Sequence, residues 1–259
     1  MKSLCVIGAN GLLGGELVAF LKNFYEVTGI DLENYASLVG GSFDVLVNAN
    51  GNSRRFWANR NVLDDFTAST ISVYKTLFDF KFKKYIYISS SDVYRDHSSP
   101  LTTEENQRIE AKAICPYGFH KYLGEVIVSS RTEDYLILRF SMILGRRLKK
   151  GPIFDVLNNQ PLFVSLDAEI QMITGWKLAA VIKLLLEKGI TGEIFNVGGR
   201  GVVAFLELAG LLGRPVVARP DAEEQKYQMN VTKLGALFPL KTSQQYLKEF
   251  LEKIKMSGT

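Results

Sequence analysis

The chain has 259 residues, of which 47% are hydrophobic and 22% charged, and its formal net charge is +4. This length is sufficient for one large domain, or for one domain that carries a small lobe, with a sizeable core. No apolar run approaches the roughly 20 residues that a membrane-spanning helix needs, and so small a charge predicts neither a membrane nor a nucleic-acid partner.

The two cysteines are too few and too far apart for a disulfide framework or a metal site. Cys5 lies in a predicted strand, and Cys115 precedes a proline far along the chain. The first residues place a lysine before an apolar stretch, but Asn10 and the glycines interrupt it before it reaches the length of a signal peptide. We therefore expect a cytoplasmic protein without a bound metal.

The first half of the chain alternates short apolar runs with stretches of helical spacing. Predicted strands cover residues 3–8, 25–31, 43–51, 84–91 and 134–140, and predicted helices cover residues 12–22, 33–41, 61–80 and the segment that begins at residue 116. Strands that alternate with helices indicate an α/β protein with a parallel sheet and helices on both faces.

After Gly145 the pattern changes to shorter, mixed segments. A strongly apolar helix over residues 176–189 and a strand over residues 193–199 are predicted, and two more helical stretches follow. We therefore expect the second half to form a small lobe that wraps back onto the sheet.

A glycine-rich turn, GANGLLG, separates the first predicted strand from the first predicted helix. Backbone without side chains can approach a pyrophosphate there, and the amides at the start of the helix point toward it. Glycines also serve in ordinary tight turns, but their position between a buried strand and an amphipathic helix favours a dinucleotide cradle. The predicted cradle consists of Gly8, Asn10, Gly11, Leu12 and Gly14.

Asp31 ends the second predicted strand, 23 residues after Gly8. A carboxylate at this distance accepts hydrogen bonds from the adenosine ribose of a dinucleotide. It would repel a 2′-phosphate, and residues 32–36 bring no arginine or lysine to offset the repulsion, so NAD is favoured over NADP. The alternative is that Asp31 only caps the following helix.

Tyr117 and Lys121 lie four residues apart, just after Pro116, and therefore share one face of the predicted helix. A neighbouring ammonium stabilises a phenolate and lowers the tyrosine pKa from its ordinary value of about 10. An oxidised nicotinamide nearby would act in the same direction, and this tuning suits general acid–base chemistry on an alcohol or ketone. By spacing alone, a tyrosine and a lysine on an ordinary surface helix are the commoner arrangement.

Several segments resemble the short-chain dehydrogenase/reductase superfamily, in its extended branch of nucleotide-sugar epimerases, dehydratases and reductases. They occur in the family's order and are GANGLLG, YISSSDVY, PYGFHKYLGE, LILRFSMILG, GEIFNVGG and, near the end, NVTKLGALFPL. The resemblance implies a Rossmann-like doubly wound parallel sheet with a small C-terminal substrate lobe. The implied NAD-binding domain covers residues 1–145, with residues 170–198 packing back onto it, and the lobe covers residues 146–169 and 199–259.

The resemblance also implies roles for individual residues. Ser90 would hydrogen-bond the reacting oxygen, and Tyr117 would be the acid/base. Lys121 would depress the pKa of Tyr117 and hold the nicotinamide ribose. From the residues alone, the three serines after the YIYI strand are equally typical of hydrogen-bonding groups at a strand end.

Three further positions match the family's cofactor site. Asn50 and Gly51 match a segment that passes under the cofactor, and Phe140 matches a position near the nicotinamide. The chain departs from the family between Asp31 and Asp44, where about a dozen residues replace the usual additional strand and helix. We therefore expect one strand fewer than usual.

The substrate side departs further from the family. Its nucleotide-sugar members usually carry an asparagine where this chain has Met142, and a proline where it has Arg146. Arg146, Arg147 and Lys149 could hold an anionic substrate, although a solvated loop is the favoured interpretation.

These observations predict an NAD-dependent oxidoreductase or epimerase that acts on a carbinol or keto carbon of a sugar, with nucleotide-sugars as the expected substrates. A dehydratase is less favoured, because Ser91 and Asp92 stand where the family's dehydratases have an Asp-Glu pair. The alternative is a catalytically silent NAD(P)-binding protein with a regulatory or structural role. A homodimer is expected through the helix of residues 61–80 and the Tyr117 helix.

Overall fold

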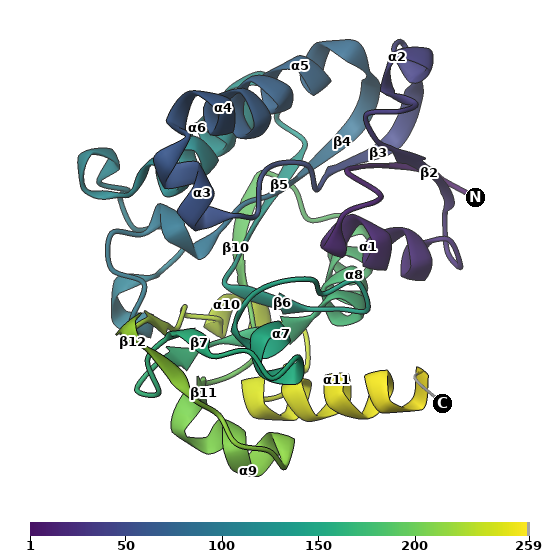
Figure 1. Ribbon diagram of the computed structural model, residues 1–259. Helices are drawn as coiled ribbons and strands as arrows, with labels where there is room; N and C mark the ends of the chain where they lie inside the picture. The colour runs from purple at the N-terminus through teal and green to yellow at the C-terminus, as the bar shows by residue number, and fades with distance from the viewer. Residues whose placement is uncertain (258–259) are drawn as a thin grey trace.

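The computed structural model describes residues 1–257. Its centre is a six-stranded sheet in the order β2-β1-β3-β4-β5-β10, in which every neighbouring pair is parallel (Figure 1). The strands are β1 (Ser3–Ile7), β2 (Glu26–Ile30), β3 (Ser42–Asn48), β4 (Lys81–Ile88), β5 (Tyr135–Phe140) and β10 (Glu193–Val197).

Helices cover both faces of this sheet because its strands are apolar on both sides. On β1, Leu4 and Val6 pack toward α1 (Leu12–Leu21) and α8 (Gly175–Glu187), whereas Cys5 and Ile7 belong to the core on the opposite face. That face is covered by α2 (Tyr35–Leu38), α3 (Arg55–Arg60), α4 (Val62–Phe66), α5 (Ser72–Asp79) and α6 (Pro116–Arg131). The expected doubly wound α/β architecture is therefore confirmed.

The connection between β2 and β3 is short. Within the described residues it contains only the four-residue helix α2 and no strand, so β2 is the edge strand of the sheet. The expected loss of one strand is confirmed.

The predicted helix of residues 61–80 is interrupted at its centre. α4 and α5 are joined by a π-helical turn, η1 (Thr67–Ile71). Such turns frequently mark functional sites, since the extra residue re-aims neighbouring side chains. Here Ser69 and Thr70 are buried; Thr70 donates to His120 O of α6, and Ser69 lies beside the segment that follows β3.

A second core lies below the sheet in Figure 1, among short strands and helices of the C-terminal part. β6 (Met142–Leu144) pairs with β9 (Met172–Thr174), β7 (Leu162–Val164) with β12 (Ala218–Glu223), and β8 (Glu169–Ile170) with β11 (Val203–Ala204) and β13 (Lys226–Tyr227). The helices here are α7 (Pro152–Leu157), α9 (Leu208–Leu212), α10 (Thr232–Gly235) and α11 (Ser243–Ser257). The domain boundaries given above stay a prediction.

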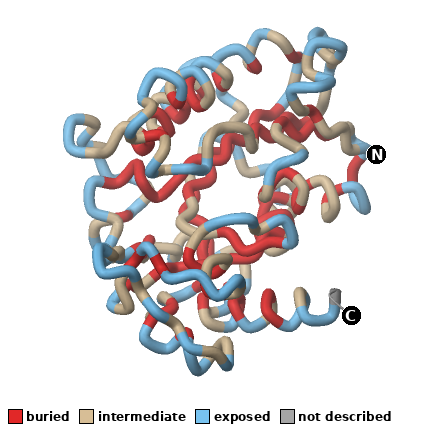
Figure 2. The backbone as a smooth tube through the Cα atoms, viewed as in Figure 1, coloured by how far each residue is buried: buried red, intermediate tan, exposed pale blue. Residues whose placement is uncertain are grey.

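Short 3₁₀ turns complete the fold: η2 (Ser91–Val93), η3 (Pro100–Thr102), η4 (Ala111–Ala113) and η5 (Phe205–Glu207). Figure 2 shows that the buried backbone follows the strands and the inner helix faces. None of the helices in the described part of the chain combines the length and apolar character needed to cross a membrane.

A buried ion pair joins α6 to β5. Arg139 Nη2 lies 2.6 Å from Glu125 Oε2, and Arg139 Nε donates to Glu125 Oε1 at 2.9 Å. Both side chains are almost completely buried, and Tyr94 and Ser89 complete their hydrogen bonding. The pair therefore holds the helix that carries Tyr117 against the sheet.

Replacing Glu125 by Ala is expected to destabilise the protein by about 3–5 kcal/mol, because the Arg139 guanidinium would stay buried without its carboxylate. The matched control is Glu187→Ala, which removes an exposed helical pair with Lys183 and is expected to cost under about 1 kcal/mol. Urea unfolding of both variants measures the difference. Equal losses in the two variants would contradict this account.

Candidate active site

The glycine turn forms a close junction between β1 and α1. Gly8 has a φ of +81° and its amide donates to Ile30 O at 2.8 Å, which ties the turn to the end of β2. A Cβ on Gly14 would lie 2.0 Å from Gly8 O, so only glycine lets α1 pack this closely. The N-cap residue Gly11 supplies no side-chain cap, which leaves the first amides of α1 for a phosphate. The turn therefore fits the pyrophosphate of a dinucleotide.

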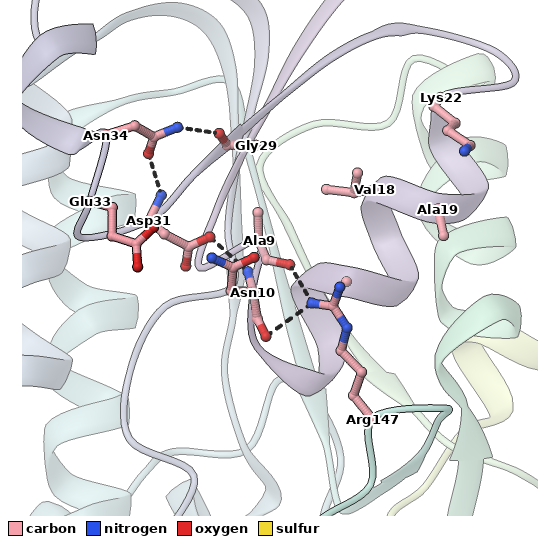
Figure 3. A pocket seen from close by; sticks show the side chains of 11 residues that line it. Ala9, Asn10, Val18, Ala19, Lys22, Gly29, Asp31, Glu33, Asn34 and Arg147 are labelled. Carbon is pink, nitrogen blue, oxygen red and sulfur yellow. Dashed lines mark hydrogen bonds between the residues drawn. The ribbon is translucent and has the colours of Figure 1, made fainter.

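Asp31 lies directly beside this turn, after the last residue of β2. Its Oδ2 accepts a hydrogen bond from the Asn10 amide at 2.7 Å, and Asn34 Oδ1 accepts from the Asp31 amide at 2.8 Å. The N-cap position of α2 is Asn34, so the Asp31 carboxylate does not cap that helix. Asp31 lines a cavity of about 440 Å³, and Figure 3 shows its side chain beside Asn10. Its contact with an adenosine ribose stays a prediction.

Lys121 connects the end of β4 with the segment that follows β3. Its Nζ donates to Ile88 O at 3.2 Å, and a Cβ on Gly51 would lie only 3.1 Å from the same Nζ. Gly51 has a φ of +125°, a conformation that favours glycine. Asn50 continues this segment past the glycine turn, since its Cα would lie 3.1 Å from a Cβ on Gly8. The structure thus brings the ammonium and the predicted cradle together.

Ser90 and Tyr117 are both buried next to each other, between the end of β4 and the start of α6. Ser90 Oγ donates to Asp92 Oδ2 at 3.1 Å and accepts from the Asp92 amide at 3.2 Å. The Tyr117 amide donates to Asn59 Oδ1 at 3.0 Å, which fixes the first turn of α6. To hold a substrate oxygen, the serine hydroxyl has to exchange its carboxylate partner for that oxygen.

Burial raises the pKa of the Tyr117 phenol above its ordinary value, and the negative charge of Asp92 adds to this rise. The Ser90 hydroxyl acts in the opposite direction as a hydrogen-bonding group. Burial thus dominates the pKa of Tyr117 in the protein alone, and the expectation that Lys121 depresses this pKa stays a prediction. The phenol is protonated at neutral pH, as a proton donor must be.

Gly118 sets the distance between the tyrosine helix and the serine segment. A Cβ at this position would lie 2.0 Å from Asp92 O and 2.7 Å from its carbonyl carbon. The backbone of α6 can therefore approach the Ser90–Asp92 segment only because this residue is glycine.

Asp92 is the centre of a polar cluster that the sequence did not predict. Its Oδ1 lies 2.8 Å from Arg55 Nε and 3.7 Å from His97 Nε2, and it accepts from the Tyr227 hydroxyl at 3.3 Å. Burial would raise the pKa of this carboxyl, but His97, Arg55 and Ser90 together hold it below its ordinary value. Asp92 is therefore ionised, and it ties β13 and α3 to the serine segment.

The comparisons with known proteins agree with this geometry. Residues 4–198 match the NAD dependent epimerase/dehydratase family. The chain belongs to this family. The family's enzymes are NAD(P)-dependent, which confirms the resemblance to extended short-chain dehydrogenases/reductases and NAD as the cofactor. The residues of the cradle stay a prediction. A search of curated protein sequences found no significant match.

Solved structures show that this family member has the fold of three kinds of enzyme. A dTDP-4-dehydrorhamnose reductase from Bacillus anthracis in complex with NADP has a TM-score of 0.79 and 16% identity, with 97% of this chain and 98% of that chain covered. A UDP-glucuronic acid 4-epimerase from Bacillus cereus in complex with NAD has a TM-score of 0.75 and 18% identity, with 97% of this chain and 99% of that chain covered. A dTDP-glucose 4,6-dehydratase from Bacillus anthracis in complex with NAD has a TM-score of 0.71 and 17% identity, with 99% of this chain and 97% of that chain covered.

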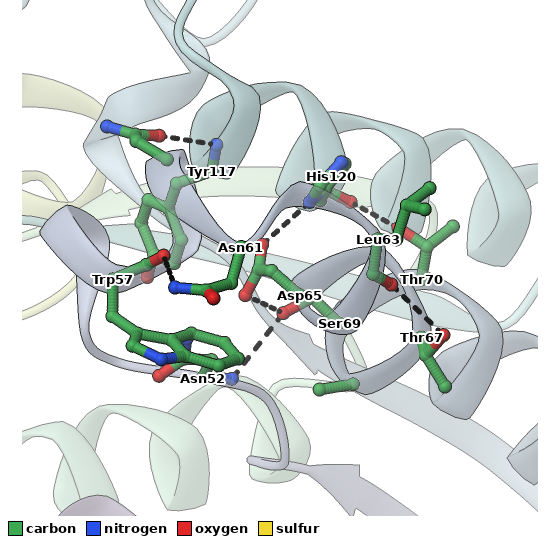
Figure 4. Close-up of polar contacts among 12 residues, drawn as sticks. Asn52, Trp57, Asn61, Leu63, Asp65, Thr67, Ser69, Thr70, Tyr117 and His120 are labelled. Atoms are coloured by element: carbon green, nitrogen blue, oxygen red, sulfur yellow. Dashed lines mark hydrogen bonds and ion pairs between the residues drawn. The ribbon is translucent and has the colours of Figure 1, made fainter.

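A second buried pair supports α6, the helix that carries Tyr117, in this family member. His120 Nδ1 lies 2.6 Å from Asp65 Oδ2, and Ser69 Oγ donates to Asp65 Oδ1 at 3.2 Å (Figure 4). Ser69 Oγ also accepts from the Asn52 amide at 3.4 Å, so the π-helical turn is connected to the segment beside Lys121. Asp65 and His120 carried no signal in the sequence, because their pairing depends on how α4 meets α6.

The remaining predicted residues have clear positions. Leu12 begins α1, and its side chain would lie 3.1 Å from a Cβ on Gly145. Phe140 ends β5 and packs, partly buried, against the core on the α1 and α8 face. Arg146 Nε lies 3.2 Å from the buried Glu16 Oε1, so this arginine anchors its loop to α1. The binding roles of Leu12 and Phe140 stay predictions.

Because of Lys121, the dinucleotide affinity of the enzyme is expected to decrease on the alkaline side of its pH profile, near pH 8. Burial lowers the pKa of its ammonium to about 8, although Asp65 and Glu125 act in the opposite direction. The ammonium is charged below this pH and neutral above it, so dinucleotide affinity should fall as the pH rises through about 8. Titrations of NADH binding across this range measure the effect.

The control for this prediction is Lys121→Arg. Its guanidinium keeps its charge across the range, so the affinity of this variant for NADH should change little with pH. If the affinity of the arginine variant falls with pH as that of the wild type does, a group other than Lys121 causes the fall.

Proposed function

We propose that the chain is an NAD-dependent enzyme that reduces or epimerises a keto or carbinol carbon of a sugar, with nucleotide-sugars as the substrate class. The observation that supports this most is the convergence of Ser90, Tyr117 and Lys121 beside the glycine turn. The similar structures are named as enzymes of dTDP- and UDP-linked sugars, which supports this substrate class.

In the proposed mechanism, NAD supplies the hydride acceptor or donor when it is bound. Lys121 holds the ribose next to the nicotinamide and carries a positive charge at neutral pH. Ser90 hydrogen-bonds the substrate oxygen, and Tyr117 gives its proton to that oxygen or takes one from it. Asn50, Gly51 and Phe140 would line the cofactor's side of the site in this proposal.

In the direction of ketone reduction, Tyr117 acts as the proton donor. The phenol of Tyr117 has a raised pKa, so it begins the cycle with a proton to donate. A dehydratase has less support. Its acid catalyst needs a carboxyl group with a raised pKa, and Asp92 does not have one. This carboxylate has a lowered pKa and is paired with Arg55.

A panel of keto and hydroxy nucleotide-sugars, mixed with NADH or with NAD and followed at the nicotinamide absorbance, tests the proposal. Epimerisation is followed in the same mixtures by NMR of the sugar, since it leaves no net change in the cofactor. The proposal expects turnover of at least one substrate. Dinucleotide binding without any turnover would instead support the alternative of a catalytically silent binding protein.

We also propose a homodimer that forms through α5 and α6. Apolar side chains are exposed on these helices and the adjoining turn: Ile71, Tyr74, Phe78 and Val126. A monomer would leave this face in water, whereas a second copy would bury it.

Both cysteines are free thiols, which fits the cytoplasm as the proposed location.

Sedimentation velocity at micromolar concentration is expected to show a dimer, which Phe78→Glu should convert to a monomer by placing a charge in the apolar contact. The control is Leu101→Glu, because Leu101 is also apolar and is more exposed than Phe78 but lies on η3, outside α5 and α6. A monomeric wild type would refute the dimer, and dissociation by both variants would refute this choice of interface.

A further inference from the structure

The cavity beside the glycine turn receives an arginine from a distant part of the chain. Arg147 follows β6, yet it lines the same cavity as Asp31 and Asn10, and Lys22, which follows α1, lines its far end (Figure 3). The sequence argument against a 2′-phosphate was that residues 32–36 contain no cation. The fold supplies two cations to this cavity from elsewhere.

The position of Arg147 is set by specific contacts. Its Nη1 donates to Asn10 O at 3.1 Å and to Ala9 O at 3.5 Å. A Cβ on Gly15 would lie 2.9 Å from Nη1 and 3.1 Å from Cζ, so the guanidinium rests on a glycine of α1. The neighbouring Arg146 is fixed to Glu16, which holds the loop in place on this helix.

Arg147 still has donors to offer. An arginine carries five N–H donors, and within residues 1–257 its Nε and Nη2 donate to no other group. Nor does any carboxylate of the described chain form an ion pair with it, in contrast to Arg146 and Glu16. A planar guanidinium with a free edge is suited to bidentate binding of a phosphate.

Asn10 connects the free edge of the Arg147 guanidinium with the carboxylate that would bind the ribose. Asn10 donates its amide to Asp31 and accepts from Arg147 through its carbonyl, so the two side chains flank a single residue of the turn. A ribose bound to Asp31 through its 2′-hydroxyl would place a 2′-substituent in the same cavity. The cavity also contains Glu33, so two carboxylates oppose the two cations.

We propose that Arg147 forms a 2′-phosphate site, so that the enzyme accepts a dinucleotide with a 2′-phosphate as well as one without it. This inference rests on the proposed cofactor site. Asp31 serves the ribose hydroxyl of NAD, and Arg147 offsets its charge when the hydroxyl carries a phosphate. The protein is thus a dual-cofactor enzyme rather than a strictly NAD-dependent one.

Calorimetric titrations with ADP-ribose and 2′-phospho-ADP-ribose test this, because the two ligands differ only in the phosphate. Arg147→Ala is expected to weaken binding of the phosphorylated ligand about 10- to 100-fold, the range of a charge-assisted hydrogen bond, and to leave ADP-ribose almost unchanged. Asp31→Asn should strengthen binding of the phosphorylated ligand by removing a like charge. Lys149→Ala, on the same loop but outside the cavity, is the control and should change neither affinity.

An equal loss for both ligands in Arg147→Ala would assign the arginine to the pyrophosphate and overturn the inference. Failure of the wild type to bind 2′-phospho-ADP-ribose would overturn it as well. These titrations measure binding of a cofactor fragment and no turnover, so they separate this inference from the proposed function. Selective binding without turnover would refute only the function, whereas turnover with NADH and no 2′-phosphate binding would refute only the inference.

Discussion

Replacing Tyr117 by Phe is expected to lower turnover about 10²- to 10⁴-fold, the usual contribution of a general acid or base. The substitution removes one oxygen and keeps the ring that fills the buried space between α6 and the serine segment. Dinucleotide affinity should therefore stay within about twofold of wild type, because the change acts on proton transfer and not on the cradle. Single-turnover rates and NADH titrations measure the two effects separately.

The matched control is Tyr122→Phe, which removes a hydroxyl from the same helix at a position that packs against the small core of Val93 and Tyr94. It should keep its turnover. If Tyr117→Phe retains wild-type turnover, or if both variants lose it equally, the assignment of Tyr117 as proton donor fails.

Replacing Gly118 by Ala should lower turnover about 10²-fold without removing any reacting group, since a misplacement of about 1 Å has an effect of this size. The new Cβ would lie 2.0 Å from Asp92 O, so α6 has to move away from the serine segment. Overpacking of this kind also costs about 1–3 kcal/mol of stability. Turnover and urea unfolding are measured on the same preparation.

Gly210→Ala is the control for this variant, because Gly210 also lies in a helix but has no atom within 4 Å of its added Cβ. It should be neutral or slightly stabilising, as alanine favours the helix. A Gly118→Ala enzyme with full turnover would show that the spacing between Tyr117 and Ser90 tolerates such a shift.

The local parts of the fold and site could be predicted from the sequence. The residues on both faces of β1 are apolar, so its sequence predicts that the strand is buried between two layers of helices. The glycine turn and the spacing of Tyr117 and Lys121 are also local patterns, and helical geometry alone places the last two on one face. The short connection after Asp31 predicted the missing strand by its length.

The parts that escaped prediction depend on contacts between distant segments. Burial raises the pKa of Tyr117, and burial is a property of the assembled fold. Arg55, Asp92 and Tyr227 meet only because α3, η2 and β13 converge, and nothing in their spacing indicates this. Arg147 likewise reaches the cavity from beyond β6, so a search near Asp31 in the sequence could not find it.

The loop that leaves β6 has a kinetic consequence. Its two arginines are fastened to the first helix of the sheet, while the residues that follow continue into α7 and the second core. The start of the chain segment that leads into α7 is therefore already fixed in the protein without a ligand. This loop does not have to wait for a dinucleotide before it takes its position, so it imposes no compulsory order of addition on the dinucleotide and the sugar.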